Sequence, residues 1–218
     1  MTIRAIFFDI GETLINESRL WLEWADWMGV SALTMCAMIG VTIARDEHHH
    51  NALRRIRPGF DVEREEAARE AAGRPNTFDE RDLYPDARPC LETLRSQGYL
   101  IGLAGNQPSR ADELIRALNL PFDVLATSGA WGVEKPSPAF FDLIVKAAEL
   151  KPEDIAYVGD RLDNDILPAR AAGMTTVFIR RGPWAYEHAT RPEIAQAHIR
   201  IESLAELPGA LRAFSEET

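Results

Sequence analysis

The sequence has 218 residues, of which 46% are hydrophobic, so it allows one doubly wound core with a smaller insertion but is short for two independent domains. The formal net charge of −10 is spread along the chain, since residues 15–84 hold 9 basic against 13 acidic side chains and the other residues hold 15 against 21. Neither part offers the cluster of cations that displaces counterions from phosphates, so we expect no nucleic-acid partner.

The first predicted strand, Ile3–Phe8, is an apolar run that ends in Asp9-Ile10-Gly11-Glu12-Thr13-Leu14. The carboxyl ends of parallel strands open onto the ligand crevice of a doubly wound sheet, so Asp9 stands where a carboxylate nucleophile is needed. The structural alternative is an aspartate that caps a tight turn, and this stretch alone supports the two interpretations equally.

Residues 15–84 show helical periodicity and no convincing strand, so they predict an all-helical insertion between the first and second strands. Trp21, Trp24 and Trp27 recur at three-residue spacing, near one face of a helix. For most of them we favour packing in the core of this insertion over contact with a substrate.

The insertion also contains His48, His49 and His50 in succession. Three neighbouring histidines resemble a metal cluster, but consecutive helical positions point in different directions. We therefore do not expect these side chains to converge on one ion.

Strands and helices alternate after the insertion, which predicts a parallel sheet. The further strand-length runs are Tyr99–Ala104, Asp123–Thr127, Ile155–Val158, Thr175–Ile179 and the weaker Ala197–Ile201. Helical patterns cover Ala87–Gln97, Ala111–Leu118 and Pro138–Leu150, and a final helix opens with Ser203 and Glu206 at capping-box spacing. The predicted fold class is α/β, with a doubly wound, Rossmann-like parallel sheet core in residues 1–14 and 85–218 and an inserted all-helical cap domain in residues 15–84.

Polar clusters lie at the ends of these elements. Gly105-Asn106 follows the second strand, Lys135 lies in the stretch WGVEKPS, and the run Gly159-Asp160-Arg161-Leu162-Asp163-Asn164-Asp165 follows the fourth strand. Taken singly, each of these residues has a structural alternative, a surface lysine for Lys135 and an ordinary turn residue for Thr13 and Asn106. A lysine before Pro136 is nevertheless informative, because the chain has only three lysines against 21 arginines.

Together and in this order, the stretches resemble the four motifs of the haloacid-dehalogenase (HAD) superfamily, including its Lys-Pro step and its GD-x4-D run ahead of Ala172-Gly173-Met174. The resemblance covers residues 3–14 and about 84–181, and the position of the insertion is similar to that in members with a helical cap after the first strand. It implies a Mg²⁺-dependent hydrolase that acts on a small phosphorylated metabolite through an aspartyl-phosphate intermediate.

The chemistry of phosphoryl transfer agrees with this resemblance, because it needs a positioned anion, a divalent cation and a fixed ammonium group. Asp9, Asp160 and Asp165 supply oxygen ligands for Mg²⁺, and Lys135 supplies the ammonium. The resemblance adds the main-chain carbonyl of Gly11 as a ligand and lets Asp165 act through water. It also implies substrate-binding roles for Thr13, Gly105, Asn106 and Lys135. We interpret Asp163 as a helix cap.

The sequence departs from the family at Gly11, where most phosphatases of the family carry a second aspartate as general acid and base, and at Gly105, which replaces a Ser or Thr. Acid/base assistance is worth about 10² to 10⁴-fold in rate. Glu12 is the candidate replacement, because its longer side chain could reach the leaving group. The alternatives are a catalytically weak protein that binds metal and phosphorylated ligands without turnover, and, less favoured, a haloacid dehalogenase.

The two cysteines, Cys36 and Cys90, fit neither a disulfide framework nor a structural zinc site, and their apolar neighbours predict buried free thiols in a reducing compartment. Asp9 and Glu12 interrupt the apolar N-terminal run, unlike a signal peptide, and no stretch of about 20 apolar residues exists. We therefore expect a cytoplasmic protein with no membrane partner. The sequence defines neither the substrate nor the oligomeric state.

Overall fold

The computed structural model describes residues 2–217 and divides the chain into two compact units. The core unit comprises Met1–Asn16 and Leu83–Thr218, and the inserted unit comprises Glu17–Asp82. The limits expected for the insertion, residues 15 and 84, each differ from these boundaries by two residues.

The core unit is built on a parallel sheet, so the prediction of a doubly wound α/β fold is confirmed. In the described residues the sheet has six strands in the order β3-β2-β1-β4-β5-β6. The strands are β1 (Ala5–Phe8), β2 (Leu100–Gly105), β3 (Val124–Thr127), β4 (Ile155–Gly159), β5 (Thr175–Ile179) and β6 (Ile199–Ile201). The order reverses between β1 and β4, which is the point where ligands bind in sheets of this kind.

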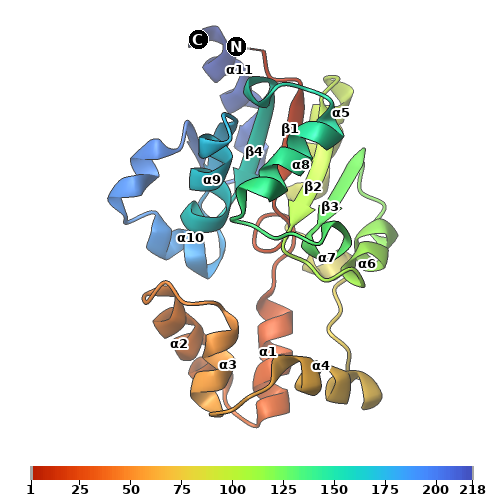
Figure 1. The fold of residues 1–218 in the computed structure, drawn as a ribbon, viewed down its shortest axis with the longest axis vertical. Helices are drawn as coiled ribbons and strands as arrows, with labels where there is room; N and C mark the ends of the chain where they lie inside the picture. The colour runs from red at the N-terminus through yellow and green to blue at the C-terminus, as the bar shows by residue number, and fades with distance from the viewer. Residues whose placement is uncertain (1, 218) are drawn as a thin grey trace. The chain divides into compact units, whose positions relative to one another are not determined.

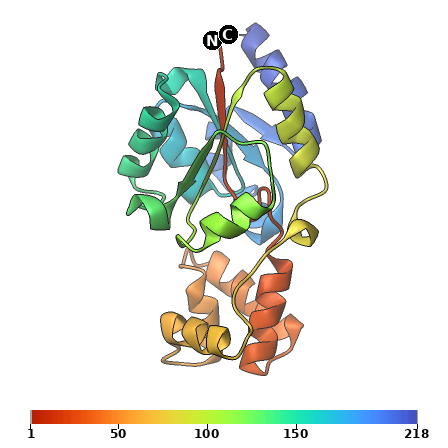
Figure 2. The same ribbon diagram turned by 90° about the vertical axis from the view of Figure 1, so that its right-hand side faces the viewer.

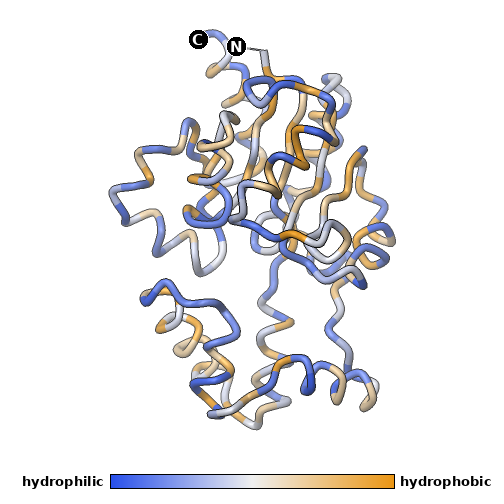
Figure 3. The backbone as a smooth tube through the Cα atoms, viewed as in Figure 1, coloured by the Kyte–Doolittle hydropathy of each residue, from blue (hydrophilic) through white to orange (hydrophobic). Residues whose placement is uncertain are grey.

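The central strands are buried on both faces, which explains their continuous apolar sequences. Every residue of β1, β4 and β5 is buried, and in Figure 3 the hydrophobic colour concentrates in the strands and in the helices that pack on them. Phe7 of β1 and Tyr157 of β4 share a cluster with Phe140 and Phe141 of the helix α8 (Pro138–Ala148). This cluster fixes α8 against the middle of the sheet.

Helices cover both faces of the sheet. The view in Figure 1 shows α8 and α9 (Leu167–Ala171) on one face, and Figure 2 shows α5 (Ala87–Ser96) and α11 (Leu207–Glu217) on the other. The remaining core helices are α6 (Ala111–Ala117), α7 (Ser128–Trp131) and α10 (Gly182–His188), with short helical turns at Pro152–Asp154, Leu162–Ile166, Pro192–Gln196 and Leu204–Glu206.

The start of the last helix differs from the expected capping box. Ser203 Oγ accepts from the N–H of Ala205 at 3.2 Å, and Glu206 Oε1 accepts from the N–H of Glu202 at 3.2 Å. The two side chains therefore satisfy backbone donors, but the reciprocal pairing of a capping box is absent from these contacts, because a 3₁₀ turn precedes α11.

The regular elements described in the inserted unit are all helical: α1 (Ser18–Met28), α2 (Ala32–Ile43), α3 (His50–Ile56), α4 (Val62–Ala71) and a 3₁₀ turn at Glu80–Asp82. Trp21 and Trp24 are buried, as the packing interpretation predicted, and the ring of Phe60 meets Trp24 edge-on. Trp27 is partly buried and donates from its indole N–H to Glu65 at 2.8 Å.

The prediction of buried thiols is correct for Cys90, which lies on the sheet-facing side of α5, and wrong for Cys36, which lies on the exposed side of α2. Within residues 2–217, no single helix is long and apolar enough to cross a membrane. Only α1 and α2 taken together, across a bend of 113°, have the necessary length and composition.

Candidate active site

The candidate site lies at the carboxyl ends of β1, β2 and β4, where the strand order reverses. Asp9 directly follows β1, and its N–H donates to Val158 O of β4 at 2.8 Å. Asp160 directly follows β4. Strand pairing therefore brings together two carboxylates that are 151 residues apart in the sequence.

Lys135 lies at the centre of the site, in the loop between α7 and α8. Its Nζ donates to Asp9 Oδ1 at 2.5 Å and to Asp165 Oδ1 at 2.6 Å, and all three residues are buried. Burial alone would lower the pKa of Lys135, but the carboxylates of Asp165 and Asp9 outweigh burial and raise it well above its ordinary value. The lysine therefore remains an ammonium ion and offsets part of the negative charge.

The single ammonium group of Lys135 does not balance the three carboxylates of Asp9, Asp160 and Asp165. Ligand oxygens of Asp9, Asp160 and Asp165 all lie within 4.8 Å of one another, and Asp160 Oδ2 is buried with no hydrogen-bond partner among residues 2–217. Burial, followed by the charges of Asp165 and Asp9, raises the pKa of Asp160 well above its ordinary value, and burial raises that of Asp165 to about 6. A hard divalent cation fits this set of oxygen donors and would supply the missing partner.

Asp165 is held from several sides. Its Oδ2 accepts from the N–H of Arg161 at 3.0 Å, while Oδ1 accepts from Lys135. A Cβ on Gly159 would lie 2.4 Å from Asp165 Cγ, so glycine at that position gives the carboxylate its room. Asp163, expected as a helix cap, instead forms an ion pair with Arg161 at 2.5 Å, because the chain continues as a π-helical turn.

Asn106 connects the second strand to the lysine loop. Its Nδ2 donates to Lys135 O and its Oδ1 accepts from the N–H of Lys135, both at 2.8 Å. These two bonds fix the backbone that carries the ammonium group, so the side-chain amide of Asn106 acts here as a positioning group. Its predicted contact with a substrate remains a prediction.

The turn after β1 places Glu12 rather than Gly11 in the left-handed region, with φ of 54°. Tyr84 OH donates to Glu12 Oε2 at 2.5 Å, and a Cβ on Gly182 would lie 2.6 Å from Glu12 Cβ. Burial, and then the charge of Glu12, raises the pKa of Tyr84, so its hydroxyl stays protonated and continues to donate. Glu12 therefore lies in a fitted pocket, and its charge also raises the pKa of Asp160. Gly11 itself is partly exposed.

The two other predicted substrate ligands, Thr13 and Gly105, lie in the turn after β1 and at the end of β2. Thr13 is fully buried, and within the described part of the chain its hydroxyl oxygen has no hydrogen-bond partner. Gly105 ends β2 so close to Asp9 that a Cβ there would lie 3.3 Å from Asp9 Oδ1. The glycine in place of the family's hydroxyl residue thus leaves the main chain as the nearest donor at this position.

Sequence reasoning missed a second set of charges, a buried arginine and a partly buried aspartate, that supports the turn after β1. Arg181 follows β5 and donates to Thr13 O at 3.1 Å and to both carboxylate oxygens of Asp86, and its guanidinium lies 4.2 Å from the ring of Tyr84. The only sequence signal was the location of Arg181 just beyond a strand's carboxyl end, which it shares with Asp9 and Asp160. Asp86 and Tyr84 carried no such signal, because they precede a helix.

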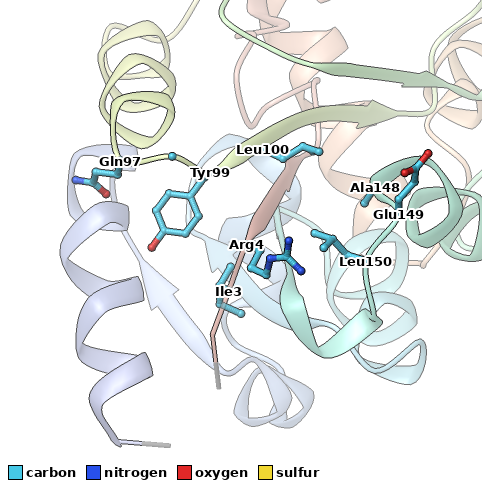
Figure 4. Close-up of a pocket in the computed structure, with 9 residues that line it drawn as sticks. Ile3, Arg4, Gln97, Tyr99, Leu100, Ala148, Glu149 and Leu150 are labelled. Carbon is cyan, nitrogen blue, oxygen red and sulfur yellow. The ribbon is translucent and has the colours of Figure 1, made fainter.

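A separate pocket lies at the opposite, amino-terminal ends of β1 and β2 (Figure 4). It is lined by Ile3, Arg4, Gln97, Gly98, Tyr99, Leu100, Ala148, Glu149 and Leu150. It contains none of the predicted site residues and lies at the end of the sheet where ligands are not expected. We therefore keep the carboxyl ends of the strands as the candidate site.

Comparison with known proteins assigns the family. The chain matches the haloacid dehalogenase-like hydrolases over residues 3–173. It is 34% identical over 204 residues to the glyceraldehyde 3-phosphate phosphatase of Methanopyrus kandleri, covering 84% of this chain and 86% of that protein. The corresponding protein of Pyrococcus furiosus is 30% identical over 203 residues, covering 84% and 83%. The chain therefore belongs to the haloacid dehalogenase-like hydrolase family, as the resemblance of its motifs predicted.

Solved structures agree on the fold. The β-phosphoglucomutase of Clostridium difficile superposes with a TM-score of 0.68 at 18% identity, covering 99% of each chain. A predicted phosphoglycolate phosphatase of Haemophilus somnus gives 0.67 at 21% identity, covering 96% of this chain and 98% of that one. At these identities the likeness defines the architecture alone.

Proposed function

We propose that this hydrolase is a Mg²⁺-dependent phosphatase that cleaves small phosphorylated metabolites through an aspartyl-phosphate intermediate on Asp9. The observation that carries this proposal is the buried ion pair of Lys135 with Asp9 and Asp165 beside the carboxylate of Asp160. The names of the relatives support the substrate class, since two refer to glyceraldehyde 3-phosphate and a third, from Thermus thermophilus and 32% identical over 155 residues, refers to phosphoserine.

The carboxylates of Asp9 and Asp160, with the main-chain carbonyl of Gly11, would hold the Mg²⁺. Both oxygens of Asp165 already accept hydrogen bonds from the protein, so we assign it a contact through water. When bound, the ion offsets the charge of the carboxylates and of the phosphoryl oxygens.

In the first half of the reaction, a carboxylate oxygen of Asp9 attacks phosphorus, and the leaving oxygen takes the electron pair of its bond to phosphorus. Lys135 presents its ammonium group to the transferring oxygens, and the main chain at Gly105 and Asn106 and the hydroxyl of Thr13 orient them. Water then hydrolyses the aspartyl phosphate and regenerates Asp9.

In this proposal Glu12 is the general acid and base. It takes this role because Gly11 stands at the position where most phosphatases of the family carry an aspartate. Its support is the buried carboxylate itself, held by Tyr84 at a left-handed position that most residues avoid. The inserted unit would act as the cap that selects the substrate. The free thiols of Cys36 and Cys90 are typical of a reducing compartment, which favours a cytoplasmic location.

The test of the proposal is a panel of an aryl phosphate, an acyl phosphate, phosphoserine and glyceraldehyde 3-phosphate, assayed with Mg²⁺ and with a chelator. We expect phosphate release that requires Mg²⁺ and is abolished by Asp9→Asn. Ligand binding without turnover above the Asp9→Asn control would support the binding-protein alternative. Metal-independent halide release from a 2-haloacid would support a dehalogenase.

The role of Glu12 has its own test. Glu12→Gln should slow a sugar phosphate by about 10² to 10⁴-fold while changing an aryl phosphate far less, because only the poor leaving group needs a proton. Tyr84→Phe keeps the ring and should give a weaker effect in the same direction. If both variants slow the two substrates equally, Glu12 supports the fold of the turn and is not the acid.

A further inference from the structure

The inserted unit contains a second group of metal-ligand side chains, formed by the three histidines that sequence periodicity had excluded as a cluster. One ligand nitrogen from each of His48, His49 and His50 lies within 4.8 Å of the other two. The ring centroids are 4.1 to 4.6 Å apart in all three pairs.

The convergence has a simple backbone cause. His50 is the first residue of α3, and His49 before it already has helical dihedrals (φ −53°, ψ −33°), whereas His48 lies outside the helix, so the three residues do not form one continuous helical run. Asp46, with φ of 54°, ends α2 in a left-handed turn, and the N–H of Glu47 donates back to Thr42 O at 3.1 Å.

Side chains of α3 also restrain this turn. Glu47 accepts hydrogen bonds from Asn51 at 3.2 Å and from Arg55 at 2.5 Å, which connects the turn to the first two turns of α3. The ring of His49 packs edge-on against Trp21 with centroids 6.1 Å apart. The three imidazoles therefore start from a restrained backbone, which lowers the entropy lost when they bind an ion.

We propose that His48, His49 and His50 form a site for a divalent transition-metal ion of the zinc class. Three imidazole nitrogens suit Zn²⁺, Ni²⁺ or Cu²⁺, whereas Mg²⁺ prefers oxygen ligands. The donor chemistry thus separates this site from the carboxylates of Asp9, Asp160 and Asp165.

Ligation needs the three imidazole rings to move closer together. Tetrahedral Zn²⁺ with bonds of about 2.0 to 2.1 Å places its nitrogens about 3.3 Å apart, so each pair of ligand nitrogens must close by at most about 1.5 Å. His48 Nδ1 accepts a long hydrogen bond of 3.3 Å from the N–H of His50, and the metal would compete with that weak bond for the same lone pair. His48 is exposed and the other two rings are partly buried, so the ion can enter from solvent and keep a water ligand.

The site would fix the connection between α2 and α3, the two helices that the turn joins. Its occupancy should stabilise the folded chain because the ion binds the restrained cluster more tightly than the unfolded chain.

The test uses the full chain without a polyhistidine tag, stripped of metal and titrated with Zn²⁺ by calorimetry in saturating Mg²⁺. We expect one Zn²⁺ per chain and a rise in melting temperature. His48→Gln, His49→Gln and His50→Gln should each weaken binding by about tenfold or more, whereas His198→Gln in the core unit should not. His48→Gln is the decisive variant, because this exposed side chain can be changed with little risk to folding.

Absence of Zn²⁺ binding to the unaltered chain, or an affinity for Zn²⁺ in all three histidine variants equal to that of the unaltered chain, would overturn the proposal. So would Zn²⁺ binding that is lost in Asp160→Asn but kept in His48→Gln, since the ion would then lie among the carboxylates. Visible absorption of a Co²⁺-loaded chain, present in the wild type and in His198→Gln and lost in His48→Gln, would identify imidazole ligation directly.

Discussion

At the scale of single residues, Lys135 determines how much the buried carboxylates of Asp9, Asp160 and Asp165 destabilise the folded state. Its ammonium is the shared partner of Asp9 and Asp165 inside the protein. Lys135→Met should abolish activity and, without Mg²⁺, should lower the free energy of unfolding by about 3 to 5 kcal/mol, because it leaves uncompensated buried carboxylates. Denaturant unfolding with and without Mg²⁺ measures this, and saturating Mg²⁺ should recover part of the loss.

The matched control is Lys146→Met on the exposed side of α8, which should change stability by less than about 0.5 kcal/mol. A Lys135→Met protein as stable as the control in the absence of Mg²⁺ would show that the ion pair does not hold the site together.

Gly159 provides a second residue-scale prediction. A methyl group there would lie 2.4 Å from Asp165 Cγ, and the short aspartate side chain cannot bend away. Gly159→Ala should therefore displace Asp165, cost about 2 to 4 kcal/mol and reduce kcat sharply. Gly209→Ala in α11, where a Cβ meets nothing within 4 Å, should leave activity unchanged and stabilise by up to about 1 kcal/mol. Equal effects of the two changes on kcat would contradict the packing argument.

At the scale of elements, Asp86 connects segments that lie far apart in the sequence. It precedes α5 and accepts from Arg181 beyond β5, and from Ser203 Oγ at 2.7 Å and Leu204 N at 2.9 Å beyond β6. Burial alone would raise its pKa, but the hydrogen bonds of Arg181 and Ser203 outweigh burial and hold the pKa below its ordinary value.

A carboxyl with a lowered pKa in the folded state contributes stability above its unfolded pKa of about 3.9 and loses it as pH falls through the folded pKa. Asp86→Asn should therefore destabilise by about 2 to 4 kcal/mol near neutral pH, with the difference from wild type shrinking below about pH 4. Urea unfolding over this pH range measures it. A difference that grows towards acid pH would have the wrong sign for this account.

Several elements could be predicted from sequence because their signals are local. Buried parallel strands need continuous apolar runs, so even the short β6 was found, and polar residues just after β1 and β4 placed Asp9 and Asp160 at the carboxyl ends of strands. The charge cluster that includes Lys135 followed from the family resemblance, since the lysine lies 126 residues from Asp9 and no local pattern relates them.

The remainder depends on contacts that no local pattern encodes. The pairing of Tyr84 with Glu12 spans 72 residues and that of Arg181 with Asp86 spans 95. The prediction that His48, His49 and His50 would not converge was wrong for a different reason, because it applied a helical period to residues of which two precede α3. The prediction of a buried Cys36 was wrong because α2 has apolar residues on its exposed side as well, so hydrophobic neighbours in the sequence did not imply burial.

At the scale of the whole molecule, protons and Mg²⁺ should compete for the acidic cluster and so couple stability to pH. Burial raises the folded-state pKa of Asp165 to about 6 and that of Asp160 well above its ordinary value. For carboxyls with raised pKa, the metal-free folded state binds more protons than the unfolded state, so this contribution to stability falls as pH rises from about 4 towards 6 and stays low above. Mg²⁺ reverses that loss because it binds the ionised carboxylates. The rise in melting temperature caused by Mg²⁺ should therefore be large near pH 8 and nearly vanish near pH 5. Asp160→Asn should remove the rise, while Glu202→Gln, an exposed carboxylate paired with Arg180, should retain it. An equal rise at both pH values, or a full rise in Asp160→Asn, would mean that the ion binds elsewhere in the chain.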